Sequence, residues 1–152
     1  MGTTTFSGPV RSGTLKTGET NGPNLGYAVL EQETSITQNS TSAVSSTLYI
    51  PAGSKIVDII VDVLTAFNSA TSAVLSVGTA AAGTQYASGV DVKTATGRIR
   101  PTFTAAQLAA MSNVSVLGVA APTTAPVVVT VTPTGATSAG YVRVTVVYAQ
   151  LA

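Results

Sequence analysis

The sequence predicts an all-β protein, an antiparallel β-sandwich of jelly-roll type with one short helix and an extended N-terminal arm. Segments rich in β-branched residues recur along the chain, and turn residues separate them about every 8–12 residues. Only one segment carries helix signals, and alternating strand–helix units are absent, which argues against a parallel sheet. At 152 residues the chain fits one folded domain, expected over residues 25–152 after an arm of residues 1–24.

The arm is rich in Gly, Thr, Ser and Pro and has no apolar periodicity, so it cannot form a core alone. Fully extended, it reaches about 80 Å, whereas the body should have a radius of gyration of about 14 Å. It is either a frayed tail or an arm that orders on a partner. Spaced apolar and basic residues favour the second interpretation, with partner contacts expected at Phe6, Val10, Arg11, Leu15 and Lys16. No signal-peptide pattern opens the chain, so we expect synthesis in a cytoplasm.

The first half of the body reads as strands joined by polar turns. Residues Tyr27–Gln38 predict one long strand or two short ones, and Ala43–Ile50 predict the next. Pro51–Ser54 form a tight turn. The stretch "KIVDIIVDVL", Lys55–Leu64, is a strand because most of its residues are β-branched.

Two aspartates in that strand, Asp58 and Asp62, raise the question of an active site. On a strand they share a face but lie about 13 Å apart, which is too far for the paired carboxylates of a glycosidase. We therefore expect each to be solvated or to contact an Arg or Lys. The alternation assigns one parity to the core: Val57, Ile59, Val61 and Val63.

The second half continues the pattern. Further strands are expected at Ala73–Thr79, in short pieces near Tyr86 and Val90–Val92, and at Val114–Ala120, Pro126–Thr132 and Gly140–Gln150. The last strand alternates most clearly, with valines and Tyr148 on one face and Arg143 and Thr145 on the other. The only predicted helix is Thr104–Met111, where Thr104 and Gln107 have capping-box spacing.

Composition excludes several kinds of chemistry. The chain has no Cys, His or Trp, so disulfides, thiolate or imidazole metal sites and His-dependent nucleophiles are impossible. The six acidic residues are too scattered for a calcium loop, and no phosphate-binding loop is present. Asp91, near Lys93 and Arg98, is expected to anchor a loop or form an ion pair. We therefore predict no catalytic, cofactor or metal site, and no small-molecule substrate. A sugar site without Trp would depend on the scattered tyrosines, most of which we expect to be packing residues.

The chain has few charged residues and many hydroxyl-bearing ones. Charged residues make up 9% of the chain and the net charge is +1, so no basic field exists for nucleic acid. No apolar run approaches the roughly 20 residues of a membrane span. Thr and Ser together number 40 of 152 residues. Such a surface either relies on hydroxyls for solubility or is covered by other subunits, and we favour the second interpretation because few charges oppose association.

Three stretches form a recognisable pattern: "LYIPAGSKIVDIIVDVLTAFNSATSAVLSVGT", "FTAAQLAAM" and "TTTFSGPVRSGTL". Together they resemble small virion proteins of tailed bacteriophages. The pattern combines a Pro-Ala-Gly turn, an aliphatic strand with Asp, a "TAFN" loop and a "LSVGT" strand. It carries no catalytic signature.

Such virion proteins include capsid decoration, or cement, proteins, which are β-rich, often trimeric and placed on the outer capsid. The resemblance implies a non-enzymatic protein that bridges neighbouring subunits of the major capsid protein as a homotrimer, after synthesis in a bacterial cytoplasm. The alternatives are a glycan-binding head-fibre or tail adhesin module and a minor neck or tail component.

Overall fold

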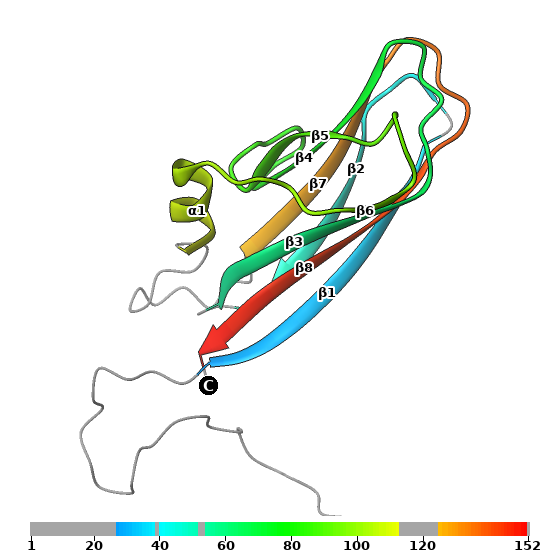
Figure 1. Cartoon of the computed structure of the whole chain (residues 1–152). Helices are drawn as coiled ribbons and strands as arrows, with labels where there is room; N and C mark the ends of the chain where they lie inside the picture. Colours follow the sequence, from blue (N-terminus) through cyan, green and yellow to red (C-terminus); the bar gives the residue numbers. More distant parts are fainter. Residues whose placement is uncertain (1–26, 39, 52–53, 113–124, 152) are drawn as a thin grey trace, which may run out of the picture.

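The computed structural model describes residues 27–38, 40–51, 54–112 and 125–151. Two four-stranded antiparallel sheets pack face to face (Figure 1), which confirms the predicted antiparallel β-sandwich. The first sheet contains, in spatial order, β1 (Tyr27–Thr37), β8 (Tyr141–Leu151), β3 (Ser54–Thr65) and β6 (Gly97–Ile99). The second contains β2 (Val44–Ile50), β7 (Ala125–Thr134), β4 (Ser72–Gly78) and β5 (Ala87–Asp91). The single helix of the described residues is α1 (Ala105–Ser112).

The strands pair in a nested order. The first strand pairs with the eighth, the second with the seventh, the third with the sixth and the fourth with the fifth. The β3–β8 and β4–β7 pairs then join these units into the two sheets. Nearly every sheet contact therefore joins residues far apart in the sequence.

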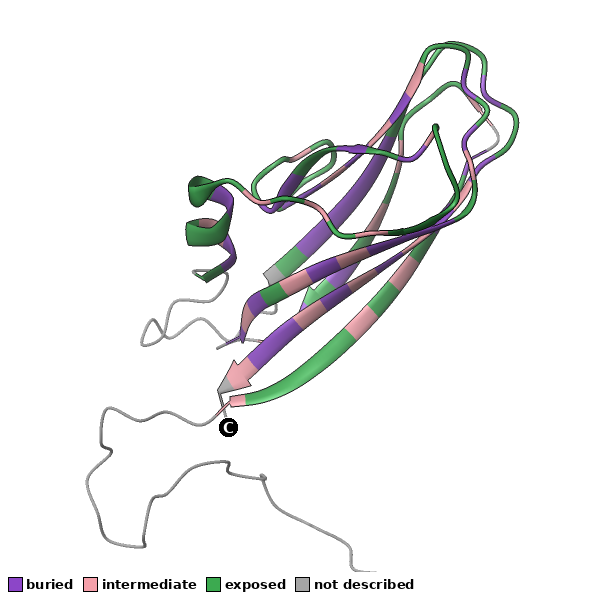
Figure 2. Ribbon diagram, viewed as in Figure 1, coloured by how far each residue is buried: buried purple, intermediate pink, exposed green. Residues whose placement is uncertain are grey.

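Alternation along the strands builds the core between the sheets. In β8 the expected face is buried, while Arg143 and Thr145 on the opposite face are partly exposed. The β4 alternation is confirmed in the same way, because Ala73, Leu75 and Val77 are fully buried. Figure 2 shows buried residues along the middle strands of both sheets and a largely exposed β1. Valine dominates the core because a branched side chain fits closely between two pleated surfaces.

One end of the sandwich is closed by its loops. Phe67, in the β3–β4 loop, is fully buried, and Gly140 lies against its ring. A Cβ atom on Gly140 would lie 2.3 Å from the Phe67 Cδ1 atom, so only glycine fits there. Backbone hydrogen bonds tie the same loops together, from Gln38 N to Gly140 O at 2.9 Å and from Asn68 N to Ala139 O at 3.1 Å.

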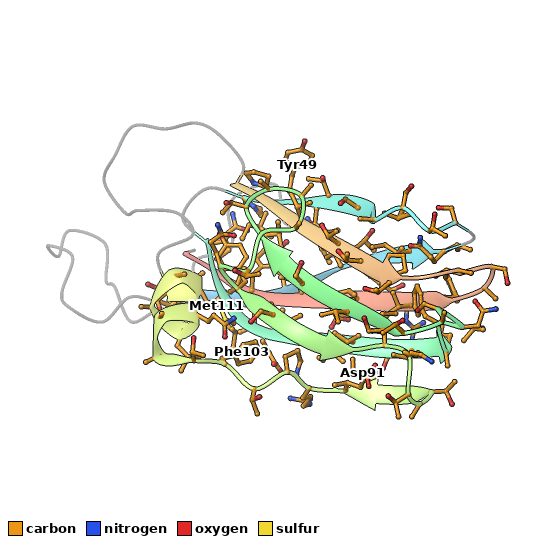
Figure 3. All side chains as sticks on the ribbon, turned by 90° about the horizontal axis from the view of Figure 1, so that it is seen from above. Tyr49, Asp91, Phe103 and Met111 are labelled. Atoms are coloured by element: carbon orange, nitrogen blue, oxygen red, sulfur yellow. The ribbon has the colours of Figure 1, made fainter. Side chains whose placement is uncertain are left out.

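Helix α1 packs against the sandwich away from those loops (Figure 1), and its N-terminus has the predicted capping box. The backbone N–H of Gln107 donates to Thr104 Oγ1 at 3.2 Å, and the backbone N–H of Thr104 donates to Gln107 Oε1 at 2.9 Å. The Gln107 side chain also donates to Thr84 O and Ser88 Oγ, which fixes the helix to the β4–β5 connection. Met111 and Phe103 point toward the core (Figure 3). No helix of the described ranges is long and apolar enough to cross a membrane.

The expected strands are largely confirmed. Of the two alternatives for the first of them, the structure has one long strand, Tyr27–Thr37. The core parity of β3 was wrong at Val57, which is 50% exposed, while Ile56 is buried instead. A β-bulge between Ile56 and Asp58 inserts one residue and reverses the alternation there. The short strand β6 was not predicted. The expected strand Val114–Ala120 and the N-terminal arm lie outside the described residues.

Candidate interaction surfaces

Ion pairs gather on the outward face of the first sheet, around Asp62. Its neighbours across the sheet are Arg98 of β6 and Arg143 of β8. Arg98 donates from Nε to Asp62 Oδ1 at 2.7 Å and from Nη2 to Oδ2 at 3.0 Å, while Arg143 Nη2 donates to Oδ2 at 3.0 Å. The Asp62 side chain is only 10% exposed. Three neighbouring strands therefore meet at one carboxylate.

The hydrogen bonds from Arg98, and next those from Arg143, lower the pKa of Asp62 from 3.8 to about 2. The carboxylate is ionised at neutral pH and its two oxygens are occupied by guanidinium donors. A group held in this way is a poor proton acceptor, because protonation would cost it both partners. We interpret Asp62 as a structural ion pair and not as a general base.

Asp58 has a different partner on the same face. Arg100 Nη1 donates to Asp58 Oδ2 at 2.6 Å, and the backbone N–H of Ile59 donates to Asp58 Oδ1 at 2.8 Å. The expectation that each aspartate contacts an Arg or Lys rather than the other aspartate is confirmed. The set also includes Glu33, whose Oε2 lies 3.3 Å from Arg143 Nε.

Most described charges belong to this one sheet. Of the ten charged residues in the described ranges, eight lie on its strands or directly after β6; together they form what we name the ionic face: Glu31, Glu33, Lys55, Asp58, Asp62, Arg98, Arg100 and Arg143. Four are acidic and four are basic, so the ionic face has no net charge. Glu31 and Glu33 are exposed, as expected of a solvated face.

The remaining two described charges, Asp91 and Lys93, lie at the end of β5. Asp91 Oδ1 accepts hydrogen bonds from the backbone N–H groups of Lys93 at 2.8 Å and Thr94 at 3.3 Å. The hydroxyl of Thr94, followed by the Lys93 N–H, lowers the pKa of Asp91. Asp91 is therefore the loop anchor that its position in the sequence indicated.

The outward face of the second sheet has no charge on β2, β7 or β4. Its outward residues, named here the hydroxyl face, are Ser45, Thr47, Tyr49, Ser72, Val74, Ser76, Val128, Thr130 and Thr132. The β4–β5 loop lies over its centre, where Ala82 N donates to Thr130 Oγ1 at 2.9 Å and Ser45 Oγ lies 2.9 Å from the same atom. The rest presents hydroxyl and small apolar groups to the surroundings.

Tyr49 is the exposed aromatic residue of this face, 58% exposed and directed away from the sandwich in Figure 3. Tyr86 and Tyr148 are buried and pack in the core, as expected for strand tyrosines. Tyr49 is not one of these packing tyrosines, because it lies on the outward face of β2, which has no covering element there in the described structure.

Enzyme-like groupings are not assembled among the described residues. Ser54 Oγ is buried without a hydrogen-bond partner there, and Lys55 Nζ lies 4.4 Å from the centroid of the Tyr27 ring. The two side chains therefore do not form a Ser-Lys pair. No group of three acidic, His or Cys residues able to hold a metal ion occurs in the described part of the chain.

The partner contacts predicted in the arm, at Phe6, Val10, Arg11, Leu15 and Lys16, lie outside the described residues. What sequence reasoning missed is the grouping of charge on one sheet. The partners of Asp62, Arg98 and Arg143, are 36 and 81 residues away from it in the sequence, so no local spacing could have indicated them.

Comparisons of this chain with protein-family models, with curated proteins and with solved structures found no match.

Proposed function

We propose that this chain is a non-enzymatic structural protein of a virus particle. It decorates the outer surface of a tailed-phage capsid and bridges neighbouring subunits of the major capsid protein as a homotrimer. The observation that carries the proposal is the separation of the two outward faces, one ionic and internally neutral, the other made of hydroxyl and small apolar groups.

The hydroxyl face is the surface best suited to contact between subunits. Burying charged groups is costly unless each keeps its partners, whereas hydroxyls can exchange water for hydrogen bonds across an interface at little cost. The uncharged surface that the β4–β5 loop leaves exposed on β2, β7 and β4 therefore favours a partner over open solvent.

The nested strand pairing supports the same class of protein. We propose that the sandwich is a jelly roll, since pairing of the first strand with the eighth, the second with the seventh and so on inward is what that arrangement requires. Jelly rolls occur in viral capsid proteins and in lectins. Fold alone does not decide between a capsid role and a lectin role. The choice between them therefore depends on the surfaces and on the arm.

The arm supplies the second attachment in this proposal. Residues 1–24 are long enough to reach past a neighbouring body, and linking two contacts through one chain raises the effective affinity without enlarging either contact. Phe6, Val10, Arg11, Leu15 and Lys16 are its proposed contact residues.

The test is rebinding of purified protein to particles of the encoding virus that have lost it. We expect the full chain to rebind on the order of hundreds of copies, as surface lattice symmetry demands. A chain without residues 1–24 should keep the far-ultraviolet circular dichroism and unfolding midpoint of the body. It should bind at least about tenfold more weakly. Equal binding of the two forms would contradict the role of the arm. A copy number of about a dozen or fewer would instead indicate a neck or tail component.

A glycan-binding role is the second candidate, and the exposed ring of Tyr49 is the observation in its favour. Sugars stack on exposed aromatic rings, and lectins share the jelly-roll arrangement. Binding of the purified protein to a glycan array, lost in Tyr49→Ser and retained in the arm deletion, would favour this role over decoration.

A further inference from the structure

The outer edge of β1 is unusually open for an edge strand. Within the described residues β1 pairs only with β8, through eleven residues in unbroken register. Long, regular edge strands tend to recruit another strand, and proteins usually prevent this with short edges, bulges, proline or charged side chains, of which β1 has only Glu31 and Glu33. β1 contains no proline and no bulge. The other edges are shorter: β6 has three residues, β5 has five with a register shift, and β2 has seven.

The first half of β1 also exposes apolar side chains on both of its faces. Along the inward-facing parity, Ile36 is buried, whereas Leu30 is 44% exposed. Val29, on the outward parity, is 65% exposed. Figure 2 shows this half of the strand as exposed. The sandwich is closed near Thr34, whose Oγ1 lies 2.6 Å from Ser46 Oγ of β2, and it opens toward the beginning of β1.

A surface depression of about 430 Å³ lies along the same half of β1, lined by Val29, Glu31 and Val147 from the outward face together with Leu30. It combines apolar walls with one carboxylate. An extended chain added along β1 would use the free backbone groups of the edge, and its alternate side chains would enter this depression.

We propose that the edge of β1 binds the arm of a second copy of this chain, through Val10–Thr20. This inference rests on the proposed function, because that function gives the arm its role. It adds the surface to which the arm binds. The segment is long enough to pair along the whole of β1 and carries Arg11, Lys16 and Glu19, a net charge of +1, whereas β1 carries Glu31 and Glu33, a net charge of −2.

Strand alternation allows two ways of facing the segment, and we propose the one that suits the residues at its centre. In that one, Lys16 lies on the outward side with Glu31, and Leu15 lies on the inward side with Leu30. The other would place Leu15 among the glutamates and the Lys16 ammonium over the apolar opening. Arg11 and Glu19 have the same parity as Leu15, so in the proposed facing they lie on its side of the strand, four residues before and after it. Because residues directly opposite share a face in both parallel and antiparallel pairs, this conclusion does not depend on strand direction.

The experiment uses the full chain, which has no native cysteine. One preparation carries Thr17→Cys in the arm, and a second, affinity-tagged preparation carries Ala28→Cys on the exposed inward side of β1. They are mixed without virus particles and treated with a bismaleimide that spans about two residue steps, or ~7 Å. Since each chain has one cysteine, a cross-linked product with one tag can form only between two copies.

We expect that one-tagged product to form readily with Ala28→Cys. The control acceptor is Thr132→Cys, which is exposed on the hydroxyl face and should give less than about a tenth of the yield. Leu30→Lys in the acceptor chain should lower the yield by about tenfold, because it places an ammonium in the apolar opening. The matched variant Leu108→Lys, on the exposed side of α1, should leave the yield unchanged.

Equal yields for Ala28→Cys and Thr132→Cys, or no product at all, would overturn the proposal. So would a chain carrying both Thr17→Cys and Ala28→Cys that cross-links only within itself, because its own arm would then occupy the edge. Cross-linking between free copies without any particle binding would leave this inference standing and remove the proposed decoration function. Particle binding without cross-linking would leave the proposed decoration function standing and remove this inference.

Discussion

Replacing Asp62 with asparagine tests the ion cluster that joins three strands of the first sheet. The variant keeps the size of the side chain but removes the charge that receives three hydrogen bonds from Arg98 and Arg143. A lowering of the Asp62 pKa from 3.8 to about 2 corresponds to roughly 2 kcal/mol of folding free energy. The Arg98 side chain is largely exposed, so solvent screening reduces the expected loss to about 1–2 kcal/mol.

The stabilising effect of Asp62 should depend on pH. Because the pKa of Asp62 is lower in the folded than in the unfolded chain, its contribution is complete above the unfolded value of 3.8 and disappears as pH falls toward about 2. The difference in unfolding free energy between the natural chain and Asp62→Asn should therefore be full at pH 5–7, on the order of 1–2 kcal/mol, and shrink between about pH 4 and 2.

Urea denaturation followed by tyrosine fluorescence, repeated along that pH series, provides the measurement. Glu31→Gln is the matched control, since it removes one negative charge from an exposed side chain of the same sheet and should change stability by less than about 0.5 kcal/mol. A difference for Asp62→Asn that stays constant from pH 7 to pH 2, or equal losses in the two variants, would refute the reasoning.

Two further predictions concern packing. Gly140→Ala should destabilise the chain by about 1–3 kcal/mol, because its methyl group would meet the buried ring of Phe67; an unchanged urea midpoint would contradict the close contact. Val57→Thr should cost less than about 0.5 kcal/mol, whereas Ile59→Thr should cost about 2 kcal/mol or more, since only Ile59 is buried. Equal losses in this pair, measured by the same denaturation, would argue against the bulge.

The elements that sequence alone predicted are those defined by neighbouring residues. The β8 alternation and the capping box of Thr104 and Gln107 depend on residues within a few positions of each other, and both are confirmed. The bulge at Val57 could not be predicted, because it arises from the pairing of β3 with β8 and leaves no mark on an aliphatic run. β6 was missed for a similar reason: three residues form a strand only where β3 offers a partner.

The candidate surfaces were less predictable than the strands. The low content of charged residues could be predicted from composition. The gathering of most described charged residues on one sheet depends on which strands become neighbours. Asp62 and Asp58 were expected to be solvated or to contact Arg or Lys, and nothing near them in the sequence identified Arg98, Arg143 or Arg100. The exposure of Tyr49 likewise follows from the position of β2 at a sheet edge, which a single sequence does not contain.

The distribution of charge also limits how this molecule can associate. Covering the ionic face would remove water from ion pairs that already satisfy one another, so a partner there would have to compensate a desolvation cost without gaining free charges to bind. Covering the hydroxyl face has no such cost, because its exposed groups are hydroxyls, apolar side chains and the Tyr49 ring. Association through the hydroxyl face would leave the ion pairs of Asp58 and Asp62 toward water, where mixed charges oppose further association.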